Sequence, residues 1–144
     1  MSSERRGHCL CGAVRIVVRD PGHELVACHC TMCRRWTGSA LVSLPVPEEA
    51  MAIEGGGNVR SYASSEFAER CFCGTCGTPL WYRLTAPAAP RDYYITAGLL
   101  DDLSGIRLTG EIYVDTRTDA FAYVGPLHQM TEAEVLASLA SPQE

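Results

Sequence analysis

Short stretches in which apolar and polar residues alternate recur along the chain, with glycine and proline between them. Residues 13–19 alternate in this way and are rich in β-branched side chains, which predicts a β-strand. An Asp-Pro-Gly turn follows directly. Similar patterns predict strands at residues 24–30, 38–47, 66–73, 78–84, 92–100 and 110–115, and two short strands about the triple glycine within residues 51–64.

One segment near the C-terminus is typical of a helix. Thr131 is followed three residues later by Glu134, which is the spacing of a capping box. Val135, Leu136 and Leu139 then form an apolar side. The predicted strands do not alternate with long helical segments, so a parallel α/β sheet is excluded. We therefore expect a mainly β, antiparallel fold with a short C-terminal helix, built as one domain over residues 1–144.

The composition narrows the class of protein. The chain has 144 residues, of which 47% are hydrophobic and 20% charged, as in ordinary globular domains. Its net charge is −5 and it has no Lys/Arg-rich segment, so we expect no nucleic-acid partner. No apolar run is long enough to cross a membrane, and residues 1–7 lack the apolar core of a secretory signal. We expect a cytoplasmic protein.

Eight cysteines are unusual in that reducing compartment, where disulfides are rare. A zinc ion binds thiolate sulfur at about 2.3 Å, so its ligands must lie close together, as tight C-x-C and C-x-x-C turns allow. Neither C-x-x-C pair opens an evident amphipathic helix, as a thioredoxin-like redox motif would, so we interpret the clusters as metal ligands. The three clusters are Cys9 and Cys11; Cys28, Cys30 and Cys33; and Cys71, Cys73 and Cys76.

The spacing suggests how the thiols divide between sites, but it leaves two arrangements open. One closed site would take its four ligands from the two knuckles at residues 9–11 and 73–76. The remaining thiols are Cys28, Cys30, Cys33 and Cys71. They form either a second closed site or a three-ligand loop at residues 28–33 that leaves a metal with an open position, as catalytic zinc requires.

The order of these motifs resembles the glutathione-dependent formaldehyde-activating family, which includes the centromere protein V type. The resemblance covers almost the whole chain and is carried by HCLCGAVRI, CHCTMCRRWTGSA, RCFCGTCGTPLWY, AGLLDD and GEIYVDTR. It implies an Mss4-like, zinc-stapled β-fold. It also implies a zinc-dependent carbon–sulfur lyase that joins a thiol such as glutathione to formaldehyde or a related small aldehyde, giving S-hydroxymethylglutathione in the named reaction.

The resemblance also implies roles for particular cysteines. A structural zinc falls on the first and third motifs, and a second, more exposed zinc falls on the catalytic central motif. The implied structural ligands are Cys9, Cys11, Cys73 and Cys76, and the implied catalytic ligands are Cys28, Cys30 and Cys33. Cys71 stands outside the pattern. We interpret it as a small buried residue, with a fourth ligand on the second zinc as the alternative.

Residues around the central motif are candidates for substrate binding. Arg34 and Arg35 suit the carboxylates of glutathione, although a solvated rim is an equal interpretation. Gly38 would bring a backbone N–H close to a ligand, or else simply form a turn. His29 is a candidate proton carrier or indirect partner of the metal, but alternation along the chain favours a side chain that points away from Cys28 and Cys30.

Three functions are therefore compared. The first is the lyase, with a small thiol and a small aldehyde as partners. The second is a non-catalytic zinc-stapled module that binds a protein or a thiol compound, since a fold does not fix a function. The third is a redox or metal-handling protein with labile thiols. We favour the first, which requires that residues 28–33 form a three-ligand site with an open position.

Overall fold

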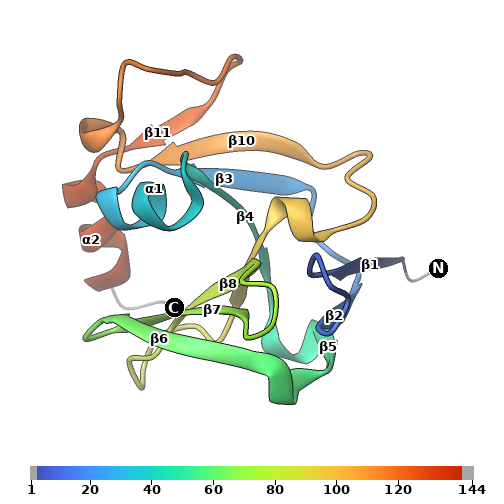
Figure 1. Ribbon diagram of the computed structural model, residues 1–144. Coiled ribbons are helices and arrows are strands. Elements are labelled where there is room, and N and C mark those ends of the chain that lie inside the picture. Colours follow the sequence, from blue (N-terminus) through green and yellow to red (C-terminus); the bar gives the residue numbers. More distant parts are fainter. Residues whose placement is uncertain (1–2, 141–144) are drawn as a thin grey trace. The chain divides into compact units, whose positions relative to one another are not determined.

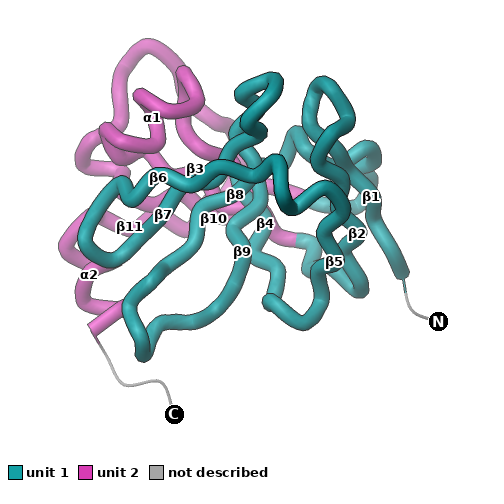
Figure 2. Tube along the Cα trace, turned by 60° about the horizontal axis from the view of Figure 1, so that its bottom comes forward, with its two compact units in different colours: residues 1–23, 43–106 teal, residues 24–42, 107–144 magenta. Residues whose placement is uncertain are grey.

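The computed structural model describes residues 3–140. Its backbone divides into two compact units, each made of two separate segments of the chain (Figure 2). The first unit comprises residues 1–23 and 43–106, and the second comprises residues 24–42 and 107–144. No helix among the described residues has both the length and the apolar composition needed to cross a membrane.

The N-terminal part of the first unit is a three-stranded antiparallel sheet, labelled in Figure 1. Its strands are β1 (Glu4–His8), β2 (Arg15–Arg19) and β5 (Met51–Glu54), with β2 in the centre. Ile16 and Val18 of β2 are fully buried, because alternate side chains of the strand point to the same face. The turn between β1 and β2 carries the first cysteine knuckle.

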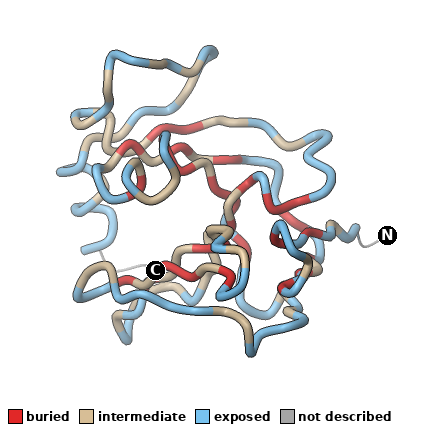
Figure 3. The backbone as a smooth tube through the Cα atoms, viewed as in Figure 1, coloured by how far each residue is buried: buried red, intermediate tan, exposed pale blue. Residues whose placement is uncertain are grey.

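The second sheet of this unit is also antiparallel, in the order β4-β9-β8-β7-β6. Residues 43–46 of β4 pair with β9. The strands are β4 (Leu41–Val46), β6 (Val59–Ser65), β7 (Ala68–Cys73), β8 (Pro79–Leu84) and β9 (Tyr93–Thr96). Leu44 of β4, Leu80 of β8 and Ile95 of β9 are completely buried, and buried and exposed positions follow one another along the strands in Figure 3.

Among the described residues, the second unit contains three complete strands and two α-helices. Their bounds are β3 (Glu24–Cys28), α1 (Thr31–Thr37), β10 (Arg107–Ile112), β11 (His128–Met130) and α2 (Glu132–Ala140). The strand β10 lies between β3 and β11 and runs parallel to both. The expected antiparallel pairing is therefore found in the first unit, whereas the two strand pairs made by β10 are parallel. Parallel neighbours need long connections, and here residues 29–106 and 113–127 supply them.

Four short 3₁₀ turns complete the described elements, at Glu48–Ala50, Gly56–Asn58, Ala97–Leu99 and Val114–Thr116. The mainly β class and the short C-terminal helix are confirmed. The Thr131 hydroxyl accepts the Glu134 N–H at 3.2 Å, and the Glu134 carboxylate accepts the Thr131 N–H at 3.2 Å, so the capping box forms as expected.

Two strands and one helix were not predicted. The strand β1 has the sequence ERRGH, which contains no large apolar residue and therefore shows no alternation of apolar and polar positions. The strand β11 has only three residues, too few for a pattern. The helix α1 was missed, and the view that the chain has one helix was wrong. The helix α1 has only seven residues, too few for a periodic pattern, and its N-cap is a cysteine rather than Ser, Thr, Asp or Asn.

Candidate metal centres

The first unit brings together four thiols from two distant knuckles. Cys9 and Cys11 lie in the turn after β1, whereas Cys73 ends β7 and Cys76 lies in the turn before β8. All four sulfur atoms lie within 4.8 Å of one another. We call this set the four-thiol group. Close hydrogen bonds shape both turns, including Gly12 N–H to the Cys9 carbonyl at 3.0 Å and Gly77 N–H to the Cys73 carbonyl at 2.9 Å.

The sulfur–sulfur distances in this group fit a tetrahedral metal. Cys9 Sγ lies 3.6 Å from Cys11 Sγ, which lies 3.8 Å from Cys73 Sγ. A zinc ion with bonds of about 2.3 Å to four sulfurs has tetrahedron edges of about 3.8 Å. Sulfur is also the donor that structural zinc prefers, so both the chemistry and the spacing of the group suit this ion.

Polar hydrogens point at these sulfurs, as negatively charged thiolates require. Cys73 Sγ accepts the Asn58 amide at 3.1 Å, the Thr75 N–H at 3.4 Å and the Cys76 N–H at 3.5 Å. The hydroxyl of Thr78, together with its backbone N–H, lowers the pKa of Cys76 to about 5. Hydrogen bonds to the ionised form stabilise it, so the knuckle prepares its sulfurs to bind a cation.

The second unit contains a group of three thiols. Cys28 ends β3, Cys30 is the N-cap of α1, and Cys33 lies buried in the first turn of that helix. Their sulfur atoms lie within 4.8 Å of one another. Cys30 has an extended backbone, and its Sγ accepts the Cys33 N–H at 3.3 Å. The cap that starts the helix is therefore also what places two of the sulfurs side by side. We call this set the three-thiol group.

Crowding makes the three-thiol group suited to a cation. Hydrogen bonds with Cys30 and then Cys33 raise the pKa of Cys28, and burial and the charges of the same two sulfurs raise it further. Three sulfurs this close cannot all be ionised unless a positive charge lies among them. A metal such as zinc supplies that charge, and the donor set fits it with one tetrahedral position left over.

Cys71 belongs to neither group among the described residues. It is buried in β7, and burial raises the pKa of its thiol while hydrogen bonds with Ser61 and Trp81 lower it. Its side chain therefore has partners of its own in the first unit. This arrangement agrees with the interpretation of Cys71 as a small buried residue.

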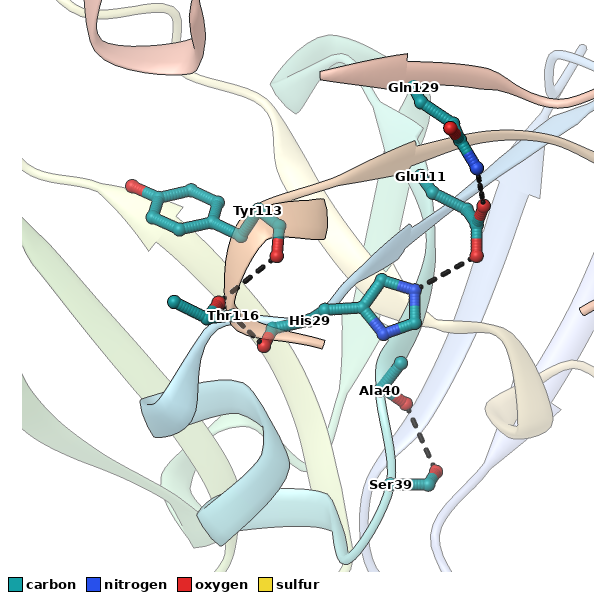
Figure 4. A network of polar contacts seen from close by, with 7 residues as sticks. All are labelled: His29, Ser39, Ala40, Glu111, Tyr113, Thr116 and Gln129. Atoms are coloured by element: carbon teal, nitrogen blue, oxygen red, sulfur yellow. Dashed lines mark hydrogen bonds and ion pairs between the residues drawn. The ribbon is translucent and has the colours of Figure 1, made fainter. Parts of the chain in front are cut away.

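His29 lies between two thiols in the sequence, but its side chain has a different partner. Its Nε2 lies 3.0 Å from Glu111 Oε1, and both side chains are buried. The other carboxylate oxygen, Oε2, accepts a hydrogen bond from Gln129 at 3.0 Å. Figure 4 shows this chain of contacts. The alternation argument against metal binding by His29 agrees with this geometry, and the buried glutamate was not predicted.

Tyr113 is a second residue that the sequence did not reveal. Its backbone is left-handed, with φ of 57°, which is strained for a bulky side chain. The Thr116 hydroxyl lies 3.0 Å from the carbonyl oxygen of Tyr113 and 3.1 Å from that of His29, so it ties this turn to the cysteine loop. Burial, and then the charges of Cys28 and Cys30, raise the pKa of the Tyr113 phenol.

The other candidate substrate residues all lie on or beside α1. Arg34 is half-buried and Arg35 is exposed. Gly38 ends the helix with a left-handed backbone, φ of 88°, and its N–H donates to the Arg34 carbonyl at 2.8 Å. That N–H serves as the helix cap, which explains the glycine. Carboxylate binding by the two arginines stays a prediction.

Comparison with known proteins shows the family to which this chain belongs. The sequence profile of the family described as glutathione-dependent formaldehyde-activating enzyme matches residues 4–116. The chain belongs to this family. It is 33% identical over 138 residues to an uncharacterized lyase of Schizosaccharomyces pombe, covering 94% of this chain and 97% of the relative. It also resembles a crystal structure of a Rhodobacter sphaeroides protein, with a TM-score of 0.57 and 25% identity over 72% of this chain and 99% of the other.

Proposed function

We propose that the protein is a zinc-dependent carbon–sulfur lyase that joins a small thiol such as glutathione to formaldehyde or a related aldehyde. Membership of the family and the similarity to a relative named as a lyase support the general class. The substrate pair and the zinc dependence are our inference from the site. We place the reaction in the reducing cytoplasm, where small thiols are kept reduced.

The observation that carries this proposal is the difference between the two thiol groups. The four-thiol group supplies a complete tetrahedron, whereas the three-thiol group supplies three ligands. Structural zinc sites are closed, and catalytic ones keep a position for substrate or water. We therefore assign a structural zinc to Cys9, Cys11, Cys73 and Cys76, and a catalytic zinc to Cys28, Cys30 and Cys33.

The reaction forms one bond between the thiol sulfur and the aldehyde carbon. The π bond of the carbonyl breaks, its oxygen takes up a proton, and the thiol loses one, so nothing is oxidised or reduced. When bound, zinc supplies Lewis acidity, which favours the thiolate form of a coordinated sulfur. The residues of the chain must bind the substrate, accept the proton that the thiol loses and supply the proton that the oxygen gains.

Two features of the chain suit these tasks. The phenol of Tyr113 carries its proton at neutral pH and is affected by the charges of Cys28 and Cys30, so we assign its Oη as a hydrogen-bond donor for the developing alkoxide. Arg34 and Arg35 follow the ligand Cys33 directly and offer guanidinium groups to the carboxylates of a glutathione-like thiol. The strained backbone at Tyr113 fits a residue whose position matters for function.

The test is an NMR exchange experiment with zinc-loaded protein, ¹³C-formaldehyde and glutathione. The protein is expected to accelerate exchange between free formaldehyde and the hydroxymethyl adduct. Cys33→Ser should reduce this to the uncatalysed rate and lower the zinc content from two ions to one per chain. Cys71→Ser, which changes a buried thiol outside both groups, should retain activity and both ions. No acceleration by the zinc-loaded protein would remove this substrate pair.

A non-catalytic zinc-stapled module predicts a different result. In that case the protein would bind two zinc ions, but no aldehyde and thiol would react faster in its presence. X-ray absorption at the zinc edge gives a separate check. An average coordination of four sulfurs at both ions would contradict the open site, whatever the activity.

A further inference from the structure

The loop that carries the three-thiol group leaves its sheet at His29. The strand β3 ends at Cys28, and the backbone N–H of the next residue, His29, still donates to the Ile112 carbonyl at 3.0 Å. Cys30 follows as the N-cap of α1, between the end of the strand and the first residue of the helix. The position of the Cys30 sulfur therefore depends on how the peptide group between His29 and Cys30 is held.

A side-chain hydroxyl holds that peptide group. Thr116 Oγ1 donates to the His29 carbonyl oxygen at 3.1 Å (Figure 4). The carbonyl group of His29 and the Cα atom of Cys30 lie in one rigid plane, because resonance hinders rotation about the peptide C–N bond. Holding the oxygen therefore limits the direction in which the chain enters Cys30, and with it the place of the Cys30 sulfur.

The same hydroxyl also holds Tyr113. Thr116 Oγ1 lies 3.0 Å from the Tyr113 carbonyl oxygen, which accepts the Thr116 backbone N–H at 3.1 Å as well. A threonine hydroxyl has one proton, so the carbonyl oxygens of His29 and Tyr113 share it. The backbone of Tyr113 is left-handed, with φ of 57° and ψ of 42°, and such a backbone at a bulky residue persists only where its surroundings hold it.

One side chain thus joins two distant parts of the proposed active site. Thr116 is 87 residues from His29 in the sequence but only three from Tyr113. Loss of its hydroxyl would release both carbonyl oxygens at once. Groups that orient a metal ligand without touching the metal typically change metal affinity or activity by about 10–100-fold when they are removed.

We propose that Thr116 is a positioning residue, whose hydroxyl fixes Cys30 of the three-thiol group and Tyr113 relative to each other. One consequence, the zinc affinity of the three-thiol group, depends on the metal site alone. The other, the rate of turnover, rests on the proposed lyase function. The two are measured separately, so a protein without lyase activity would still test the positioning role.

The first test measures zinc affinity in three variants. Thr116→Val removes the hydroxyl and keeps the shape of the side chain, whereas Thr116→Ser keeps the hydroxyl. Thr118→Val is the matched control, because the Thr118 hydroxyl accepts the Ala120 N–H at 3.1 Å within its own turn. Titration of the zinc-loaded proteins with a chelator of known affinity gives a dissociation constant for each ion. We expect Thr116→Val to weaken the less tightly bound ion about tenfold, and the other two variants to bind it as the native protein does.

The more tightly bound ion, which we assign to the four-thiol group, should be unaffected in every variant. An unchanged zinc affinity in Thr116→Val would overturn the proposal. So would an equal loss in Thr116→Ser, because the missing methyl group and not the hydroxyl would then be responsible. Equal weakening of both ions would overturn it too, since that result indicates a general loss of stability.

The second test uses the exchange assay at saturating zinc. In Thr116→Val we expect kcat to fall about tenfold with little change in KM for glutathione, because Tyr113 is displaced while the candidate carboxylate partners Arg34 and Arg35 are not. Thr116→Ser should restore kcat. If the native protein is active and Thr116→Val has the same kcat, the proposed role is wrong.

A third measurement needs no variant, and it decides the matter if Thr116→Val does not fold. A hydroxyl proton held between two carbonyl oxygens exchanges slowly with water. The Thr116 hydroxyl proton should therefore give its own resonance in ¹H NMR spectra of the native zinc-loaded protein. Exchange too fast for a resonance to be seen would overturn the proposal.

Discussion

Cys71 and Cys73 offer a direct comparison between a buried thiol and a metal ligand. Both lie on β7, two residues apart, with exposed fractions of 4% and 1%. Replacing either with alanine removes one buried sulfur, at a cost of about 1 kcal/mol for the lost packing. We expect Cys71→Ala to show this cost and little else.

Cys73→Ala should destabilise the protein much more. Three N–H groups, from Asn58, Thr75 and Cys76, would lose the sulfur that accepts them, at about 1 kcal/mol each. The metal would also lose one of its four ligands, and structural zinc sites contribute on the order of 10 kcal/mol to folding. We therefore expect a loss well above 4 kcal/mol, approaching the whole stability of a small domain.

Urea unfolding, with zinc per chain measured by mass spectrometry, tests this difference. Native protein and Cys71→Ala should both bind two zinc ions, and Cys73→Ala should bind at most one and unfold at much lower urea concentration. If the two variants lost the same stability and kept the same zinc content, the four-thiol group would not be a metal site. Removal of zinc by a strong chelator should lower the stability of Cys71→Ala much more than that of Cys73→Ala, because only Cys71→Ala has a zinc in the four-thiol group to lose.

Two further predictions concern charge and backbone. Hydrogen bonds from Arg91 and Arg83 hold the pKa of Glu48 below 4.5, so the carboxylate stabilises the fold above that pH and loses its effect as the pH falls through the lowered pKa. Acidification below about pH 4.5 should therefore reduce the thermal midpoint more steeply in the native protein than in Glu48→Gln. Gly55 has φ of 78°, and a Cβ there would overlap the backbone that precedes β2. Gly55→Ala should lower the free energy of unfolding by more than about 2 kcal/mol, whereas Gly57→Ala, where a Cβ meets nothing within 4 Å, should change it by less than about 1 kcal/mol.

Much of the sheet structure could be predicted because it depends on local alternation. The segment at residues 13–19 contains β2, and the two strands about the triple glycine are β5 and β6. Strand direction could not be predicted in the same way. Whether β10 runs parallel or antiparallel to β3 depends on how a connection of dozens of residues returns, and no short window of sequence contains that information.

In the candidate site, too, residues that are close together in the sequence could be predicted, whereas contacts between distant residues could not. Spacing within each knuckle limits where its sulfurs can lie, so the closed site and the cluster at residues 28–33 could be proposed from the sequence. Spacing left the role of Cys71 open, and only the family resemblance placed it outside both sites. Glu111 lies 82 residues from His29, and the segment that contains it reads as an ordinary strand. Tyr113 gave no signal either, because tyrosine is common in strands and its left-handed backbone is visible only once the chain is folded.

The four-thiol group joins parts of the chain that are made at different times. Cys11 and Cys73 are 62 residues apart, so at about 5–20 residues per second a ribosome needs roughly 3–12 s to pass from one knuckle to the other. During that interval the first pair of thiols has no partners with which to enclose an ion. Biosynthesis of this protein should therefore be most vulnerable to oxidants in those seconds, before the second knuckle emerges.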